Sequence, residues 1–232
     1  MNYILIGRGK MGSLIRETAQ AAGDEIQAAF DINDIDQLGK LGKVADVVID
    51  FSRPGSLPEV ASYIRRTGTP LLSGTTGLSQ TDHALLESLG AFAPVLWSAN
   101  YSLGVAVLYR ALAAVSGVLS PDFDIELTET HHNQKADAPS GTAKLLLEAI
   151  DPARALTPVY GREGNTGQRR KEEIGVHALR GGTVAGTHTV HFFGPDEELE
   201  FTHRAASRQI FVNGALHTVS YTHLRAHETV LD

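Results

Sequence analysis

The residues best suited to chemistry lie between His131 and Thr142, where the sequence reads HHNQKADAPSGT. Two imidazoles and the Lys135 ammonium fall within five residues, and Ser-Gly-Thr then opens an apolar run from Ala143 to Ile150. Histidine exchanges protons near neutral pH, and a helix start offers unpaired N–H groups and the positive end of its dipole to anions. The segment therefore predicts a site that holds a carboxylate substrate and gives it a proton.

The adjacent histidines leave three interpretations open. A metal site is disfavoured because neighbouring residues on a strand point to opposite faces, although His188, His191 and His203 offer further imidazoles. A structural interpretation buries one imidazole in the core and leaves the other in solvent. A catalytic interpretation turns one imidazole into a cleft, and it is favoured because Lys135 and the helix start converge on the same short loop.

A second motif lies near the N-terminus, where Gly7-Arg8-Gly9-Lys10-Met11-Gly12 fits G-x-G-x-x-G. It follows a strand pattern and opens a helix pattern, which is the context of a dinucleotide-binding loop. The first glycine allows a tight turn, the second lets the backbone approach a pyrophosphate, and the third allows close helix–strand packing. Asp31 stands 19 residues after Gly12, where an acidic residue is expected to bind the ribose hydroxyls.

Asp31 also bears on the choice of cofactor. A carboxylate would accept hydrogen bonds from both ribose hydroxyls of NADH and would repel the 2′-phosphate of NADPH. Ile32 follows Asp31, so no arginine stands next to it in the sequence to bind that phosphate. The residues favour NADH, and the charges of Arg8 and Lys10 keep NADPH as the alternative.

The first hundred residues alternate between strand and helix patterns, which predicts a parallel sheet with helices on both faces. The strands are expected at residues 3–6, 25–30, 44–49, 70–72 and 95–97, and the helices at 11–22, 55–67 and 79–89. Ligands bind at the carboxyl ends of such strands. The residues after these strands are therefore expected either to lie beside the nicotinamide or to form ordinary turns between strand and helix. They are Phe51, Ser52, Gly74, Thr75, Thr76, Ser98, Ala99, Asn100 and Tyr101.

The pattern changes near residue 104. An apolar helix is expected at 103–119, followed by an alternating strand at 123–127. Three more strands, at 173–179, 187–193 and 199–203, predict a mixed or antiparallel sheet. Residues 161–171 form a glycine-rich basic loop, which is either a mobile surface loop or a lid over an anion.

Composition restricts the class of protein. The chain has 232 residues, 42% of them hydrophobic, and a formal net charge of −7, which argues against non-specific binding to nucleic acid. Without cysteine it has no disulfide framework, thiolate zinc site or cysteine nucleophile. No apolar run reaches the roughly 20 residues that span a bilayer, and the N-terminus does not read as a signal peptide. A cytoplasmic protein is expected.

On these motifs the chain resembles the dihydrodipicolinate reductase family. The similar segments are Gly7–Gly12, Gly74–Gly77, Ser98–Ser102, Glu129–Ala143, Leu179–Gly182, Gly186–Val190 and Phe211–Leu216. The resemblance implies an α/β protein with a Rossmann-type domain over residues 1–103, completed by a helix at 207–216. It also implies an α+β substrate domain over 104–206, whose open mixed sheet assembles a homotetramer. The implied activity is NAD(P)H-dependent reduction of 4-hydroxy-tetrahydrodipicolinate, a cyclic dicarboxylate, in diaminopimelate and lysine biosynthesis.

The resemblance also implies roles for single residues. His131 would exchange the proton, Lys135 would be a second proton donor and carboxylate partner, and His132 would contact the substrate. Ser140, Gly141 and Thr142 would hold a substrate carboxylate at the helix start. No metal is implied.

The end of the chain departs from the family. Residues 217–232 do not continue the expected amphipathic helix, and they read as a foreign or out-of-frame tail or as a divergent terminus. Two other functions are weighed: another NAD-dependent dehydrogenase of an amino or hydroxy acid, and a nucleotide sensor without catalysis. A sensor would need the glycine loop and Asp31, but not His131 and Lys135 together.

Overall fold

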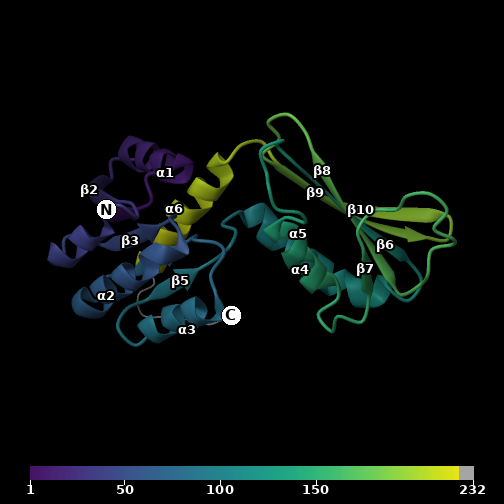
Figure 1. Cartoon of the computed structure of the whole chain (residues 1–232), viewed down its shortest axis with the longest axis horizontal. Helices are drawn as coiled ribbons and strands as arrows, with labels where there is room; N and C mark the ends of the chain where they lie inside the picture. Colours follow the sequence, from purple (N-terminus) through teal and green to yellow (C-terminus); the bar gives the residue numbers. More distant parts are fainter. Residues whose placement is uncertain (225–232) are drawn as a thin grey trace. The chain divides into compact units, whose positions relative to one another are not determined.

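The computed structural model describes residues 1–224, which form two compact units (Figure 1). The first unit combines Met1–Tyr101 with the segment that begins at Phe211, and the second contains Ser102–Ile210. Both ends of the described chain therefore belong to the same unit. None of the described helices is both long and apolar enough to cross a membrane.

The first unit is built on a sheet of five parallel strands in the order β2-β1-β3-β4-β5. These are β1 (Asn2–Ile6), β2 (Glu25–Phe30), β3 (Val47–Asp50), β4 (Leu71–Ser73) and β5 (Val95–Trp97). The predicted parallel sheet is confirmed, and its order is that of a doubly wound fold. Strand β3 is shorter than the predicted 44–49 because its pairing with β1 begins at Val47, opposite Tyr3.

Helices cover both faces of this sheet. One face packs against α1 (Lys10–Ala21) and α6 (Gln209–Leu224), where Leu5, Ile15 and Val212 share a buried cluster (Figure 1). The other face packs against α2 (Leu57–Thr67), α3 (Gln80–Leu89) and the 3₁₀ helix η1 (Ile35–Lys40), and a second 3₁₀ helix, η2 (Pro54–Ser56), leads into α2. Burial on both faces explains why β1 is an uninterrupted apolar run rather than an alternating one.

The second unit is built on a mixed sheet in the order β10-β9-β6-β8-β7. Its elements are α4 (Leu103–Leu119), β6 (Asp124–His131), α5 (Gly141–Ile150), β7 (Thr157–Val159), β8 (Glu173–Arg180), β9 (Gly186–Gly194) and β10 (Glu197–Ala205). The β6–β8 and β8–β7 pairs are parallel, and the β6–β9 and β9–β10 pairs are antiparallel. Helices α4 and α5 cover one face, where Leu112 and Leu146 pack with Leu127 and Val190.

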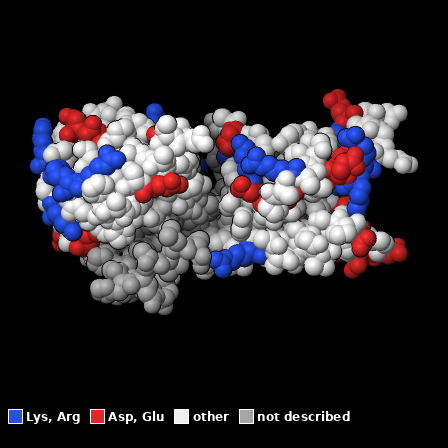
Figure 2. Space-filling view, turned by 90° about the horizontal axis from the view of Figure 1, so that it is seen from below, with Lys and Arg blue, Asp and Glu red and all other residues white. Residues whose placement is uncertain are grey.

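The opposite face of this sheet carries charge. Glu126 on β6 accepts two hydrogen bonds from Arg162, at 3.0 and 2.9 Å, and one from His177 at 2.7 Å. Arg169 bridges Glu126 and Asp124. These ion pairs attach the basic loop 161–171 to its own sheet, so these two arginines are not held ready for an anion. Figure 2 shows acidic and basic side chains side by side at the end of the second unit.

The C-terminal helix is longer than expected. Helix α6 continues past the predicted end at residue 216 and includes residues 217–224 of the atypical tail. The rest of that tail, residues 225–232, lies outside the described residues.

Candidate functional site

The glycine loop joins β1 to α1 in the way that a dinucleotide site requires. A Cβ added at Gly7, whose φ is +101°, would lie 2.4 Å from the carbonyl oxygen of Phe51, and one at Gly12 would lie 1.8 Å from the carbonyl oxygen of Gly7. A Cβ at Gly9 would meet nothing within 4 Å. Gly7 and Gly12 therefore serve packing, and Gly9 leaves open space beside the start of α1 for a pyrophosphate.

Two further residues of this loop differ in their surroundings. Lys10 is the first residue of α1 and is exposed, so its ammonium is available to a nucleotide. Met11 packs against the core cluster beneath α1, so it offers a nucleotide its backbone rather than its side chain.

Arg8 forms an ion pair with Asp31. Its guanidinium reaches Asp31 Oδ2 at 2.8 Å and Asp34 Oδ2 at 2.8 Å. The Asn33 amide donates to the other Asp31 oxygen at 2.9 Å, and this bond together with Arg8 holds the pKa of Asp31 below its ordinary value. No arginine follows Asp31 in the sequence, but folding brings Arg8, one of the two cations named as a possible phosphate partner, to it from 23 residues away.

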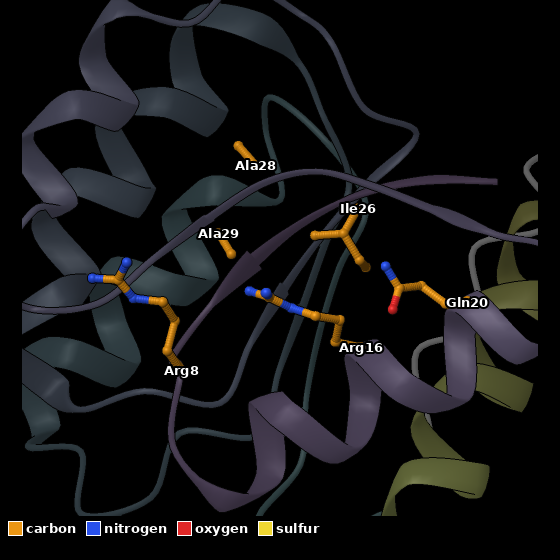
Figure 3. Close-up of a pocket in the computed structure, with 6 residues that line it drawn as sticks. All are labelled: Arg8, Arg16, Gln20, Ile26, Ala28 and Ala29. Atoms are coloured by element: carbon orange, nitrogen blue, oxygen red, sulfur yellow. The ribbon is translucent and has the colours of Figure 1, made fainter.

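A hollow of about 360 Å³ adjoins this ion pair (Figure 3). It is lined by Arg8, Arg16, Gln20, Ile26, Ala28 and Ala29. Figure 3 shows Arg16 extending from α1 toward Ala29 on β2, with Arg8 at the other end of the hollow. The end of β2 therefore combines a carboxylate with two guanidinium groups.

The loops after β3 and β4 are joined by a buried carboxylate. Asp50 is 1% exposed and accepts hydrogen bonds from the Ser52 amide and hydroxyl, Ser73 Oγ and Thr75 Oγ1, at 2.5–3.1 Å. Burial raises the pKa of Asp50, although these donors oppose the effect. The Ser52 and Thr75 side chains and the Ser52 amide are therefore turned toward Asp50, so these residues hold the two strand-end loops together.

The other candidate residues at the carboxyl ends of the parallel strands contact one another. The Phe51 and Tyr101 rings are 5.7 Å apart, the Tyr101 hydroxyl donates to the Ser73 carbonyl at 2.7 Å, and a Cβ at Gly74 would strike the Phe51 ring. Ser98 Oγ donates to the Asn100 carbonyl at 2.8 Å. Thr76 and Ala99 are exposed. The predicted strand-end residues are thus gathered at one edge of the parallel sheet.

In the second unit the central group is Glu129 on β6, which is fully buried. Its carboxylate accepts two hydrogen bonds from Arg180, both 2.9 Å, and one from the Ser140 amide at 3.0 Å, and its Oε2 lies 2.5 Å from His131 Nδ1. Burial alone would raise the pKa of Glu129, but the bonds from Arg180 and His131 bring it below its ordinary value. Glu129 is therefore an ionised acceptor that joins β6, β8 and the start of α5.

His131 is turned inward beside this carboxylate and is 9% exposed. Because Nδ1 is in contact with Glu129, Nε2 is the ring nitrogen left to exchange a proton with a ligand. A Cβ added at Gly186 would lie 3.1 Å from Nε2, and within residues 1–224 no group forms a hydrogen bond with it. Burial lowers the pKa of His131, while Glu129 raises it and Lys135 and Arg180 lower it.

The start of α5 is firmly capped. Ser140 Oγ accepts from the Ala143 amide at 3.1 Å and lies 2.9 Å from His188 Nε2. His188 is 4% exposed, and burial lowers its pKa to about 4, so it is a neutral support for the cap. Ser140 thus holds the helix start, whereas Gly141 and Thr142 form its first turn, and a Cβ at Gly141 would meet nothing within 4 Å.

Lys135 and His132 take separate partners. Lys135 Nζ donates to Asp137 Oδ1 at 2.7 Å, and Asp137 is itself largely exposed. His132 Nε2 accepts from Arg208 at 3.2 Å, and its Nδ1 is buried without a hydrogen-bond partner among the described residues. His131, the last residue of β6, and His132, which follows it, therefore face different surroundings.

The sequence reasoning assigned no role at this site to four of its residues: Glu129, Arg180, His188 and Arg208. Glu129 and Arg180 lie in segments that carry the family resemblance, but their pairing links residues 51 positions apart. Within residues 1–224, the group with metal-ligand spacing is His191 with Glu198 and Glu200, on the β9–β10 hairpin. Neither His131 nor His132 belongs to this group of residues.

The comparisons with known proteins cover both units. The family model for the dihydrodipicolinate reductase N-terminus matches residues 1–101, and the model for the C-terminus matches residues 104–231. A 4-hydroxy-tetrahydrodipicolinate reductase from an Exiguobacterium species is 41% identical over 219 residues, covering 93% of this chain and 88% of the relative. One from a Nitratiruptor species is 42% identical over 228 residues, covering 90% and 88%.

The fold is also found among solved structures. A dipicolinate-bound dihydrodipicolinate reductase from a Paenisporosarcina species superposes with a TM-score of 0.73 at 20% identity, covering 97% of this chain and 95% of that one. At this identity the likeness shows the fold, and the sequence matches carry the family assignment. The chain belongs to the dihydrodipicolinate reductase family.

Proposed function

We propose that the chain catalyses the reduction of 4-hydroxy-tetrahydrodipicolinate to tetrahydrodipicolinate by NAD(P)H, with loss of water, in diaminopimelate and lysine biosynthesis. The curated relatives bear the name of this activity. The observation that carries the proposal is the buried Glu129–His131 pair beside the capped start of α5. It joins a proton-exchanging nitrogen to an anion-binding helix terminus.

The substrate would be held by its two carboxylates. The N–H groups of the first turn of α5, at Gly141 and Thr142, suit one of them. Lys135 suits the other once it exchanges Asp137, a largely exposed partner, for the ligand. Arg208 beside His132 adds a guanidinium for the same dicarboxylate. Fixing both ends of the ring orients it, which lowers the entropic part of the barrier.

The bound nicotinamide would supply a hydride. Reduction of the ring also needs a proton at the product nitrogen, and His131 Nε2 is placed to exchange it. Burial lowers the pKa of His131, so the imidazole is mostly neutral before the substrate binds. A dianionic substrate would favour the imidazolium and so load the donor. Lys135 would be the second proton donor, and both His131 and Lys135 would contact the bound substrate.

Asp31 and Arg8 would divide the recognition of the ribose. Asp31 supports NADH as the cofactor, because its oxygens suit two ribose hydroxyls. Arg8 admits NADPH, because it neutralises Asp31 and offers a guanidinium to a 2′-phosphate. The open space at Gly9 fits a pyrophosphate in either case.

We also propose a cytoplasmic homotetramer. The face of the mixed sheet opposite α4 and α5 supports it, because beside its ion pairs Leu179 and Phe193 are 51% and 41% exposed. Large apolar side chains on an open sheet face favour association with another copy. Sedimentation of the purified chain tests the assembly.

Activity is tested with substrate generated by dihydrodipicolinate synthase and NADH oxidation as the readout. His131→Gln and Lys135→Met are expected to lower kcat on the order of 100- to 10,000-fold, the range of general acid–base catalysis. NADH affinity should be retained in both. Lys171→Met is the matched control, since Lys171 contacts Asp124 and the Phe123 carbonyl outside the proposed site.

The outcomes separate the competing functions. Binding of NADH with no turnover by the wild-type chain would favour a nucleotide sensor. Turnover of another amino or hydroxy acid alone would favour a different dehydrogenase. Full activity in both variants would show that His131 and Lys135 are not the proton donors.

A further inference from the structure

Four ionisable groups face the His131 imidazole. Glu129 lies two residues before it on β6, Arg180 comes from β8, His188 from β9, and Lys135 from the loop after β6. His188 is a neutral ring whose centroid lies 5.1 Å from that of His131. Lys135 and Arg180 are cations, so Glu129 supplies the negative charge of this group.

We propose that Glu129 is a positioning residue that fixes His131 in the tautomer with Nδ1 protonated and ties this imidazole to the anion-binding start of α5. It would act through His131 and Ser140 without touching the substrate. The inference rests on the proposed function, since that function gives His131 the proton transfer.

The charge state of Glu129 follows from its donors. An ionised carboxylate accepts hydrogen bonds and offers none. The two bonds from Arg180 keep Glu129 ionised, so the proton between Glu129 and His131 belongs to Nδ1. Neutral imidazole carries one N–H, and Nε2 must then be the acceptor that takes up a proton. The same arrangement orients the general base of the serine protease triad.

The second Glu129 oxygen joins His131 to the substrate-binding helix. Oε1 accepts from the Ser140 amide at 3.0 Å, and Ser140 is the N-cap of α5. One rigid carboxylate therefore sets both the direction of the imidazole and the position of the helix start. A shift of either would misalign the ring with its proton donor.

Glutamine is the informative replacement at position 129. Its amide oxygen would keep one acceptor, while its NH₂ would face a donor of Arg180 together with either His131 or the Ser140 amide. Two facing donors form no hydrogen bond, and of these donors only the imidazole can become an acceptor. The NH₂ is therefore expected to lie toward His131, whose imidazole would turn or change tautomer. The loss of the charge would also leave His131 beside Arg180 and Lys135 alone.

Glu126 provides a matched control on the same strand. It also accepts two bonds from an arginine, Arg162, and one from a histidine, His177. It faces the opposite side of β6, away from His131. Glu126→Gln thus removes a similar ion-pair cluster without disturbing the Glu129 network.

The direct readout is ¹⁵N NMR of the histidine rings in the free protein. It assigns each tautomer and titrates each imidazole, and His131→Gln identifies the His131 signals. Wild type is expected to show Nδ1–H at His131. Glu129→Gln should lose that tautomer and lower the His131 pKa, whereas Glu126→Gln should leave both unchanged.

Kinetics supply the second readout. Glu129→Gln is expected to lower kcat about 100-fold with a smaller change in KM, and to move the pH profile to lower pH. An Nε2–H tautomer in wild type, or an unchanged tautomer and pKa in Glu129→Gln, would overturn the inference. The NMR result stands even if the wild type fails to reduce the proposed substrate, so the two proposals fail separately.

Discussion

At the scale of single residues, Arg8 and Asp31 show that one ion pair can serve two cofactors. Arg8 is paired with the Asp31 carboxylate in the free protein, so the ribose hydroxyls of NADH must compete with Arg8 for that carboxylate. NADPH instead brings a phosphate to which Arg8 can turn, with Arg16 lining the same hollow. The ion pair therefore opposes the discrimination that Asp31 alone would impose.

Arg8→Gln should separate these effects. NADPH is expected to bind roughly 10- to 100-fold more weakly, the range for losing hydrogen bonds to a charged group. NADH should bind equally well or more tightly, because Asp31 becomes free. Calorimetric Kd values for both cofactors measure the difference, with Lys43→Gln as a surface control. An equal loss for both would instead assign Arg8 to the pyrophosphate.

The sequence identified these reactive residues but not their partners. Types and spacing singled out His131, Lys135 and Asp31, since their chemistry is local. The Arg180–Glu129 and Arg8–Asp31 pairs depend on contacts across 51 and 23 residues. Such contacts have no periodic signal, so the sequence could name Arg8 as a possible phosphate partner but could not show that it pairs with Asp31.

At the scale of elements, the sequence predicted helices and strands better than it predicted contacts between distant residues. The apolar pattern predicted α4 at its observed limits, residues 103–119, and the Ser-Gly-Thr sequence marked the start of α5. Strand β7 was missed because it has three residues, includes Pro158 and pairs with β8 alone at the sheet edge. The 3₁₀ helix η1 was missed because so short an element has almost no period to read.

The N-cap of α5 should be worth more than an ordinary cap. Ser140→Ala removes the bond to the Ala143 amide and leaves His188 Nε2 buried without its partner. Urea unfolding should show a loss of about 2 to 4 kcal/mol. Ser79→Ala, at the exposed cap of α3, should lose about 1 kcal/mol. Equal losses would show that the His188 contact adds nothing.

At the scale of the whole molecule, the first unit is completed by the far end of the chain. Val212, Ala215 and Val219 of α6 are buried in the cluster that holds Tyr3 and Leu5 of β1. Family resemblance predicted this return of the chain, whereas periodicity alone would have ended the unit near residue 103. The continuation of α6 to Leu224 was not foreseen, because the unusual composition after Leu216 concealed a helix.

Gly214 tests this closure. A Cβ there would lie 1.7 Å from the carbonyl oxygen of Tyr101, a backbone atom that cannot rotate away, so Gly214→Ala must shift α6. The expected loss is about 1 to 3 kcal/mol, with weaker NADH binding because Tyr101 supports Phe51. Gly117→Ala, within α4, meets nothing within 4 Å and should gain up to about 1 kcal/mol. Thermal unfolding should therefore shift in opposite directions for these two helical glycines, and a stabilised Gly214→Ala would mean that α6 does not need its close approach to Tyr101.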